Sequence, residues 1–294
     1  MFNYCYTRFA KKYNMKKYLM IAFAGATMFA AKTNAQVNMP APSSTQTIHQ
    51  DFGMGKIQLI YSRPSIKGRK LFEENSPIAP LGKPWRTGAN AATKISFTDN
   101  VTIGDKSFDK GDYVIYTVPG KAQWDVVFSK GNAYPGGDGF KESDDVLRLK
   151  IAPVKSGNNV ETFTMQFANI LPESCDLQLM WGKTIVNVPI KTNIKDRLRT
   201  QFEAALKSDK KPYFQAANFY YDWEKDNAKA LENVNKAIDE NKKAFYMYLL
   251  KAKIQKDMGD AAGAKATANK VIELATEAKN DDYIKQATDF LKKS

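Results

Sequence analysis

The chain has 294 residues, and its 44 Lys and Arg outnumber its 31 Asp and Glu, which gives a formal net charge of +13. It contains one His and two Cys. This composition argues against a His-rich zinc site, a Ser-His-Asp or Cys-His nucleophile and an internal disulfide framework.

Residues 1–35 have the features of a leader and signal peptide. Lys16 and Lys17 precede an apolar run over residues 18–31, and the small residues Thr33-Asn34-Ala35 follow it. The run is shorter than the ~20 residues that a membrane-spanning helix needs. We therefore expect cleavage after about Ala35, export to the periplasm or the exterior, and no membrane span in the mature chain.

Most of the apparent basicity belongs to this leader. Removing residues 1–35 takes away six basic residues and no acidic residue, so the formal charge falls from +13 to +7. Cys175 is then the remaining cysteine, and its sequence context predicts a buried, unreactive thiol. In the C-terminal part, basic and acidic residues alternate, as in Glu224-Lys225-Asp226. This pattern predicts solvated helix faces and no nucleic-acid partner.

Residues 36–45 contain two prolines and no charge, which predicts a flexible linker. From residue 46 to residue 191 apolar residues recur with period two, for example in Ile57/Leu59/Tyr61 and Leu177/Leu179/Trp181. Turn signals such as Lys110-Gly111-Asp112 separate these runs at short spacing. The pattern predicts an antiparallel β-sandwich, or a barrel-like variant, of roughly eight to ten strands.

After residue 192 the apolar period becomes helical, and Asn193 is the predicted N-cap of the first helix. Asp226 and Ala230 recur 34 residues later as Asp260 and Ala264, a period that resembles that of tetratricopeptide repeats. Residues 192–294 therefore predict an all-α domain of helical hairpins over 212–241 and 243–279 with a terminal helix. The fold class is α+β multidomain. A plain helical bundle is the alternative for this second domain.

Four segments of the β region resemble the bacterial secreted family known as domain of unknown function 2911. They are YSRPSIKGRKLF (61–72), PWRTGANAATKISF (84–97), GDYVIYTVPG (111–120) and the strand from Trp124 to Phe128. The resemblance covers about residues 45–191. It implies membership of a module but brings no reaction, cofactor or ligand with it.

Several polar and aromatic residues of these segments fall in turn-rich sequence and form a candidate ligand site. A guanidinium offers a planar fork of donors that suits carboxylate, phosphate or sugar hydroxyls. If the loops converge, they form a small polar pocket for an anionic or glycan ligand. The alternative is that the arginines satisfy backbone carbonyls and the tryptophan fills the end of the sandwich. The candidate residues are Tyr61, Arg63, Arg69, Trp85, Arg86 and Asn90.

Other candidate sites are weaker. His49 lies in a strand-like segment without the partners of a catalytic base. Asp138, Glu142, Asp144 and Asp145 could donate oxygen ligands to calcium, but their spacing does not match an EF-hand. The sequence therefore predicts no metal site and no cofactor.

Together these features favour an exported, non-enzymatic binding or scaffolding protein. The helical part is rich in aromatic residues, more than two hairpins can bury, which predicts a surface for a protein partner. The alternative is a hydrolase acting on envelope carbohydrate. That activity would require two paired carboxylates, and no sequence motif pairs them.

Overall fold

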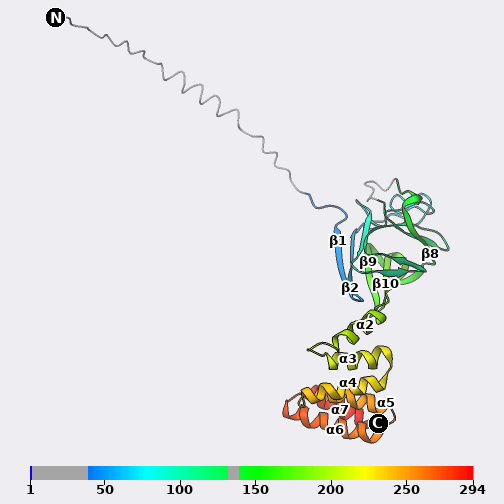
Figure 1. Cartoon of the computed structure of the whole chain (residues 1–294). Coiled ribbons are helices and arrows are strands. Elements are labelled where there is room, and N and C mark those ends of the chain that lie inside the picture. The colour runs from blue at the N-terminus through cyan, green and yellow to red at the C-terminus, as the bar shows by residue number, and fades with distance from the viewer. Residues whose placement is uncertain (2–38, 132–138, 294) are drawn as a thin grey trace. The chain divides into compact units, whose positions relative to one another are not determined.

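The computed structural model describes residue 1, residues 39–131 and residues 139–293. The predicted signal peptide and its cleavage site lie outside the described residues. A compact unit begins at Ser43. Within it, strands occupy the chain as far as Lys191 and helices follow (Figure 1). This order confirms the predicted α+β class.

Ten described strands form two antiparallel sheets. The first sheet has the order β1-β2-β3-β6-β7-β8, with the bounds β1 Thr45–Phe52, β2 Gly55–Ser62, β3 Thr93–Phe97, β6 Gly111–Val118, β7 Trp124–Ser129 and β8 Asp145–Ile151. The second has the order β5-β4-β10-β9, with the bounds β4 Val101–Ile103, β5 Lys106–Phe108, β9 Val154–Leu171 and β10 Ser174–Lys191.

The core lies between these sheets. Alternate residues of each strand enter it, such as Ile57 and Leu59 of β2 and Leu177 and Leu179 of β10, and all four are buried. Full burial of one such side chain stabilises the fold by roughly 1.5–3 kcal/mol. The predicted period-two pattern therefore identified the face of each of these strands that packs inward, and the antiparallel sandwich is confirmed.

The segment that follows β2 joins the first sheet to the outer edge of β9 in the second. The Tyr61 hydroxyl donates to the carbonyl oxygen of Met165 (3.1 Å) and accepts from its N–H (2.9 Å). Phe163 N donates to Pro64 O (2.8 Å), and Ile66 N donates to the carbonyl oxygen of Glu161. This seam, residues 61–66 against 161–165, satisfies edge groups of β9 that would otherwise require water or another strand.

The first helix after the sheets receives its cap from a distant turn. Helix α2 (Lys195–Ala205) begins after Ile194, and no residue next to it caps it through a side chain. Instead the Glu173 carboxylate accepts from the N–H groups of Ile194 (2.8 Å) and Lys195 (3.2 Å). The predicted Asn193 cap is wrong, because the turn between β9 and β10 brings a full negative charge to the positive end of the helix dipole.

The remaining helices pack as consecutive pairs, α3 with α4 and α5 with α6, and α7 packs on α6. Asp226 caps α4 by accepting from Lys229 N, and Asp260, 34 residues later, caps α6 by accepting from Gly263 N. Ala230 and Ala264 are equivalent positions of α4 and α6, and both are fully buried. The bounds are α3 Tyr213–Phe219, the π-helical turn η2 Tyr220–Glu224, α4 Asn227–Glu240, α5 Phe245–Asp257, α6 Ala261–Glu277 and α7 Asp281–Lys292.

The seam predicts that Tyr61→Phe lowers the free energy of unfolding by about 1–3 kcal/mol, because the buried N–H and C=O of Met165 lose their partner. Urea denaturation measures the change. Tyr113→Phe is the control, since the Tyr113 hydroxyl donates only to the carbonyl oxygen of Asp109. Equal losses in the two variants would contradict a special role for the seam.

Candidate functional site

The candidate site is built on the connection between β2 and β3, residues 63–92. This stretch contains no helix or strand of its own, although Ser65 and Trp85 form single bridges to Thr162 and Thr117. Loops longer than ~12–15 residues are uncommon in compact domains and are usually functional when they are ordered. The length and order of this connection therefore point to a binding or active-site loop.

The loop encloses a pocket of about 480 Å³. Four of the predicted residues line it: Arg69, Trp85, Arg86 and Asn90. The rest of the lining consists of four prolines with Ser43, Ile78, Gly88 and Ala89. The volume lies within the ~300–1,000 Å³ of typical small-molecule sites.

Hydrogen bonds to backbone carbonyls hold both pocket arginines. Arg69 donates from Nε to the carbonyl oxygen of Ile66 (3.0 Å) and from Nη2 to that of Ser65. Arg86 donates from Nη1 to the carbonyl oxygen of Asn90. The Asn90 side chain in turn donates to Ser43 O (3.0 Å). The carbonyl contacts of the alternative interpretation are therefore present, and the same guanidinium groups also line the pocket.

Trp85 belongs mainly to the core. Its indole stacks on Trp181, with ring centroids 5.4 Å apart and an interplanar angle of 17°, and its Nε1 donates to Gly88 O (3.1 Å). Only 5% of its surface is exposed. Trp85 therefore contributes an edge to the pocket and has no free face on which a ligand ring could stack.

Tyr61 and Arg63 are not among the residues that line the pocket. Tyr61 is buried in the seam described above, and Arg63 donates to Phe163 O (3.2 Å) and Thr164 Oγ1 (2.9 Å) of β9. These contacts position the start of the loop against the second sheet. The structure therefore brings four of the six predicted residues together and gives the other two supporting places.

Backbone strain is concentrated in the same loop. Thr87 has φ +55°, a conformation rarely adopted by a β-branched residue, and Asn90 has φ +58°. Thr87 is fully buried, its hydroxyl donates to Thr117 Oγ1 (3.2 Å), and its carbonyl oxygen accepts from Thr93 Oγ1. Strained residues held by their surroundings are frequent at ligand sites. Thr87 thereby fixes the backbone on which Arg86 and Asn90 stand.

The chemistry required by the hydrolase alternative is not present at this pocket. None of its described lining residues is a carboxylate, so no acid/base pair flanks the Trp85 and Arg86 region there. His49 is exposed on β1, within 3.4 Å of the Gln58 amide. Cys175 is buried, and burial raises the pKa of its thiol to about 12. Neither side chain lines the pocket or supplies a nucleophile to it.

The predicted calcium ligands do not assemble either. Asp138 lies outside the described residues. The Asp145 carboxylate accepts from the Tyr116 hydroxyl (2.7 Å) and from Arg148 (3.0 Å). Over the described part of the chain, no three His, Cys, Asp or Glu residues cluster as metal ligands do. In the same described part, no helix has both the length and the apolar character needed to cross a membrane.

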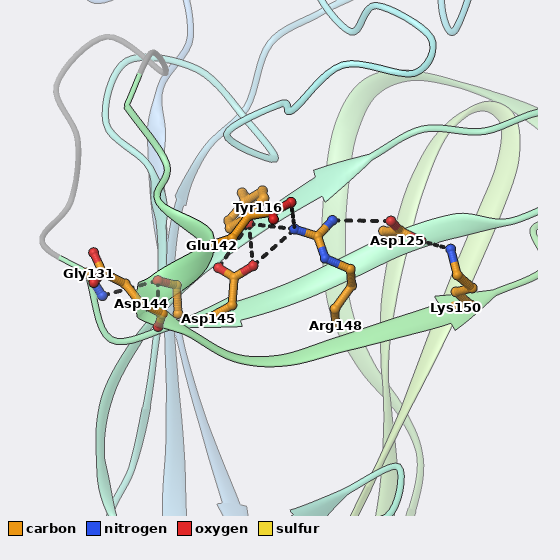
Figure 2. A network of polar contacts seen from close by, with 9 residues as sticks. Tyr116, Asp125, Gly131, Glu142, Asp144, Asp145, Arg148 and Lys150 are labelled. Atoms are coloured by element: carbon orange, nitrogen blue, oxygen red, sulfur yellow. Dashed lines mark hydrogen bonds and ion pairs between the residues drawn. The ribbon is translucent and has the colours of Figure 1, made fainter.

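A second polar cluster, which the sequence analysis did not find, lies on the face of the first sheet opposite the core (Figure 2). Arg148 of β8 donates to Asp125 of β7 (3.1 Å), to Asp145 and to the Tyr116 hydroxyl of β6 (3.0 Å). Lys150 Nζ donates to Asp125 Oδ1 (2.8 Å) from the position directly opposite in the strand register. The cluster braces three strands near the edge of the sheet.

Its polar groups satisfy one another, so the cluster has a structural role. The only sequence signal was the alternation of charged and apolar residues in Trp124-Asp125-Val126 and Leu147-Arg148-Leu149. Such alternation identifies the wet face of a strand but not the partner across it. The pairing of Asp125 with Lys150 and Arg148 therefore depended on a register that only the folded sheet supplies.

The fold and pocket define a β-sandwich binding module followed by helical hairpins. A family model described as protein of unknown function (DUF2911) matches residues 43–190, half of the chain, and the chain belongs to this family. The predicted resemblance over 45–191 is confirmed. A comparison with curated proteins finds no match.

The Asp125 pairs predict a specific dependence on pH. Burial by itself raises the pKa of Asp125, but hydrogen bonds from Lys150 and Arg148 outweigh it and hold the pKa below its ordinary value. A lowered folded pKa stabilises the protein above the unfolded pKa of about 3.9, and this contribution is lost as the pH falls through the folded value. Asp125→Asn should cost about 1–3 kcal/mol at pH 7, and the difference should shrink below about pH 4.

Urea denaturation at pH 7, 5, 4 and 3 measures this difference in the free energy of unfolding. Asp105→Asn is the control, because Asp105 is exposed on the turn between β4 and β5 and forms no ion pair with the described residues. The control should change stability by less than ~0.5 kcal/mol at each pH. A cost of Asp125→Asn that stays constant down to pH 3 would contradict the assigned pairing.

Proposed function

We propose that this chain is an exported binding protein whose sandwich holds a small anionic or glycan ligand and whose helices hold a protein partner. The observation that carries the first part is the pocket of about 480 Å³, which collects Arg69, Arg86 and Asn90 on one long loop. The strained, buried backbone at Thr87 supports it, because strain of this kind persists where the surrounding structure holds a site in place.

Export is proposed from the sequence. Lys16-Lys17, the short apolar run and Thr33-Asn34-Ala35 form the pattern of a cleaved signal peptide. A sandwich without an internal disulfide is compatible with export when its core is large, as the cluster of buried residues between the two sheets is. We therefore place the ligand and the partner in the cell envelope or outside the cell.

A non-catalytic role is favoured over hydrolysis of carbohydrate. Glycoside hydrolysis ordinarily needs two carboxyl groups ~5–10 Å apart on either side of the scissile bond. Since the described lining of the pocket offers arginine, amide and proline side chains and no carboxylate, it suits binding better than acid/base chemistry.

The helical part supports a tetratricopeptide-like scaffold for a protein partner. The caps at Asp226 and Asp260 and the buried Ala230 and Ala264 repeat every 34 residues. Such repeats stack short helical hairpins and commonly present one helix face to a peptide or protein.

A specific observation favours the face formed by α3, α5 and α7. Four aromatic rings follow one another across these helices, Phe214 to Tyr246 (5.1 Å), Tyr246 to Phe245 (6.0 Å) and Phe245 to Tyr283 (4.8 Å between centroids). Tyr246 is 36% exposed. An exposed tyrosine in a row of partly buried rings is the kind of residue that anchors protein interfaces.

Native mass spectrometry of the protein isolated from the cell envelope tests export and the pocket together. We expect a chain that begins at Gln36 and a fraction of it that carries a bound small molecule. Ala89→Phe should abolish the bound mass because Ala89 lines the pocket, whereas the control Ala91→Phe, exposed and outside the lining, should retain it. An intact leader would contradict export, and wild-type protein without any bound mass would contradict the ligand site.

The partner surface is tested by pull-down from envelope extract with Tyr246→Ser, compared with Met258→Ser as a control of similar exposure outside the row of rings. We expect Tyr246→Ser to lose a partner at least tenfold, since an interface anchor contributes about 2 kcal/mol or more. The control should retain it. Equal recovery with both variants would contradict the assignment of this face.

A further inference from the structure

We infer that the ligand of the β2–β3 pocket carries an oxyanion group, a carboxylate or a phosphate, bound by Arg69 together with Arg86 and Asn90. This inference rests on the proposed function, because it assumes that the pocket holds a ligand, and it decides between the anionic and glycan classes left open there.

The first argument is charge. Arg148, Arg197 and Arg199 each pair with at least one carboxylate of the described chain. Arg69 forms no ion pair with any described residue, and no described residue that lines the pocket is acidic. The positive charge of Arg69 is therefore not compensated by its described surroundings, which favours an anion at this position over a neutral or cationic ligand.

The second argument is the preorganisation of the Arg69 side chain. Its Nε and Nη2 groups donate to the carbonyl oxygens of Ile66 and Ser65, three and four residues earlier in the chain. These two contacts hold the guanidinium plane against its own loop. A guanidinium carries five N–H donors, so the remaining ones can bind a ligand oxygen without further ordering of the side chain.

The third argument is the balance of donors and acceptors. Sugar hydroxyls bind best where side chains offer both, whereas an oxyanion only accepts. Of the side chains that line the pocket, Arg69 and Arg86 only donate, and the acceptors are the Ser43 hydroxyl and the Asn90 amide oxygen. This donor-rich set is matched to a ligand that accepts.

The fourth argument removes the usual platform for a neutral sugar. Sugar rings commonly lie on an exposed aromatic face, but one face of the Trp85 indole is occupied by Trp181 and an edge-on contact with Phe163 adds a ring centroid at 5.0 Å. With Trp85 almost completely buried, affinity in this pocket must come from polar contacts. An oxyanion gives the strongest of these, since charge-assisted hydrogen bonds are roughly twice as strong as neutral ones.

The test measures binding of galacturonate, galactose and inorganic phosphate to the full chain by ligand-observed NMR and calorimetry. Galacturonate and galactose share a ring and differ at one position, a carboxylate against a hydroxymethyl group, so their ratio isolates the charge. We expect galacturonate or phosphate to bind at least tenfold more tightly than galactose. The comparison of galacturonate with phosphate distinguishes a carboxylate ligand from a phosphate ligand.

Arg69→Gln should weaken the bound anion roughly tenfold or more. Lys67→Gln is the matched control, because it removes the same charge from an exposed side chain two residues away that does not line the pocket. It should change affinity less than twofold. Arg69→Lys retains the charge without the planar fork and should fall between wild type and Arg69→Gln, which keeps the test informative if Arg69→Gln folds poorly.

The outcomes separate this inference from the proposed function. If galactose binds as tightly as galacturonate and Ala89→Phe abolishes both, the pocket is a ligand site and the anion inference is wrong. If none of the three probes binds, the anion inference is also wrong, and the bound mass of the envelope protein decides the proposed function independently. Equal effects of Arg69→Gln and Lys67→Gln would overturn the assignment to Arg69.

Discussion

The arrangement of the sandwich depends on the seam between residues 61–66 and the outer edge of β9. There the Tyr61 hydroxyl pairs with both backbone groups of Met165, and Arg63 donates to the neighbouring carbonyl of Phe163. An unpaired edge strand exposes donors and acceptors that must bind water or another chain. By covering that edge from within, the segment after β2 joins the two sheets and fixes the direction in which the long pocket loop leaves them.

The pocket is a consequence of this geometry. Once Pro64 is bonded to Phe163, the loop has to return to β3, and the buried Trp85 and Thr87 anchor it to Thr117 of β6 on the way. The strain at Thr87 is sustained by these contacts, since a β-branched residue rarely stays in the left-handed region without them. Arg69, Arg86 and Asn90 then lie around the space that the two anchors leave open.

The arginines illustrate how one residue type takes different roles in this protein. Arg148 is held among carboxylates on the outer face of the first sheet, where it braces β6, β7 and β8. Arg63 satisfies a strand edge. Arg69, by contrast, is fixed by local carbonyls and has no acidic neighbour among the described residues. The partners of each guanidinium, more than its presence in a motif, indicate whether it stabilises the fold or faces a ligand.

Much of the architecture was determined by the sequence alone, because alternation in residues such as Ile57, Leu59 and Tyr61 and the 34-residue period of Asp226 and Asp260 are local patterns. The family and four of the pocket residues were recognisable for the same reason. Only the tertiary structure decided that Tyr61 pairs with Met165 and that Glu173 caps α2. It likewise paired Arg148 with Asp125. These contacts join positions far apart in the chain, and their partners depend on strand register and on how the sheets stack, neither of which a local pattern encodes.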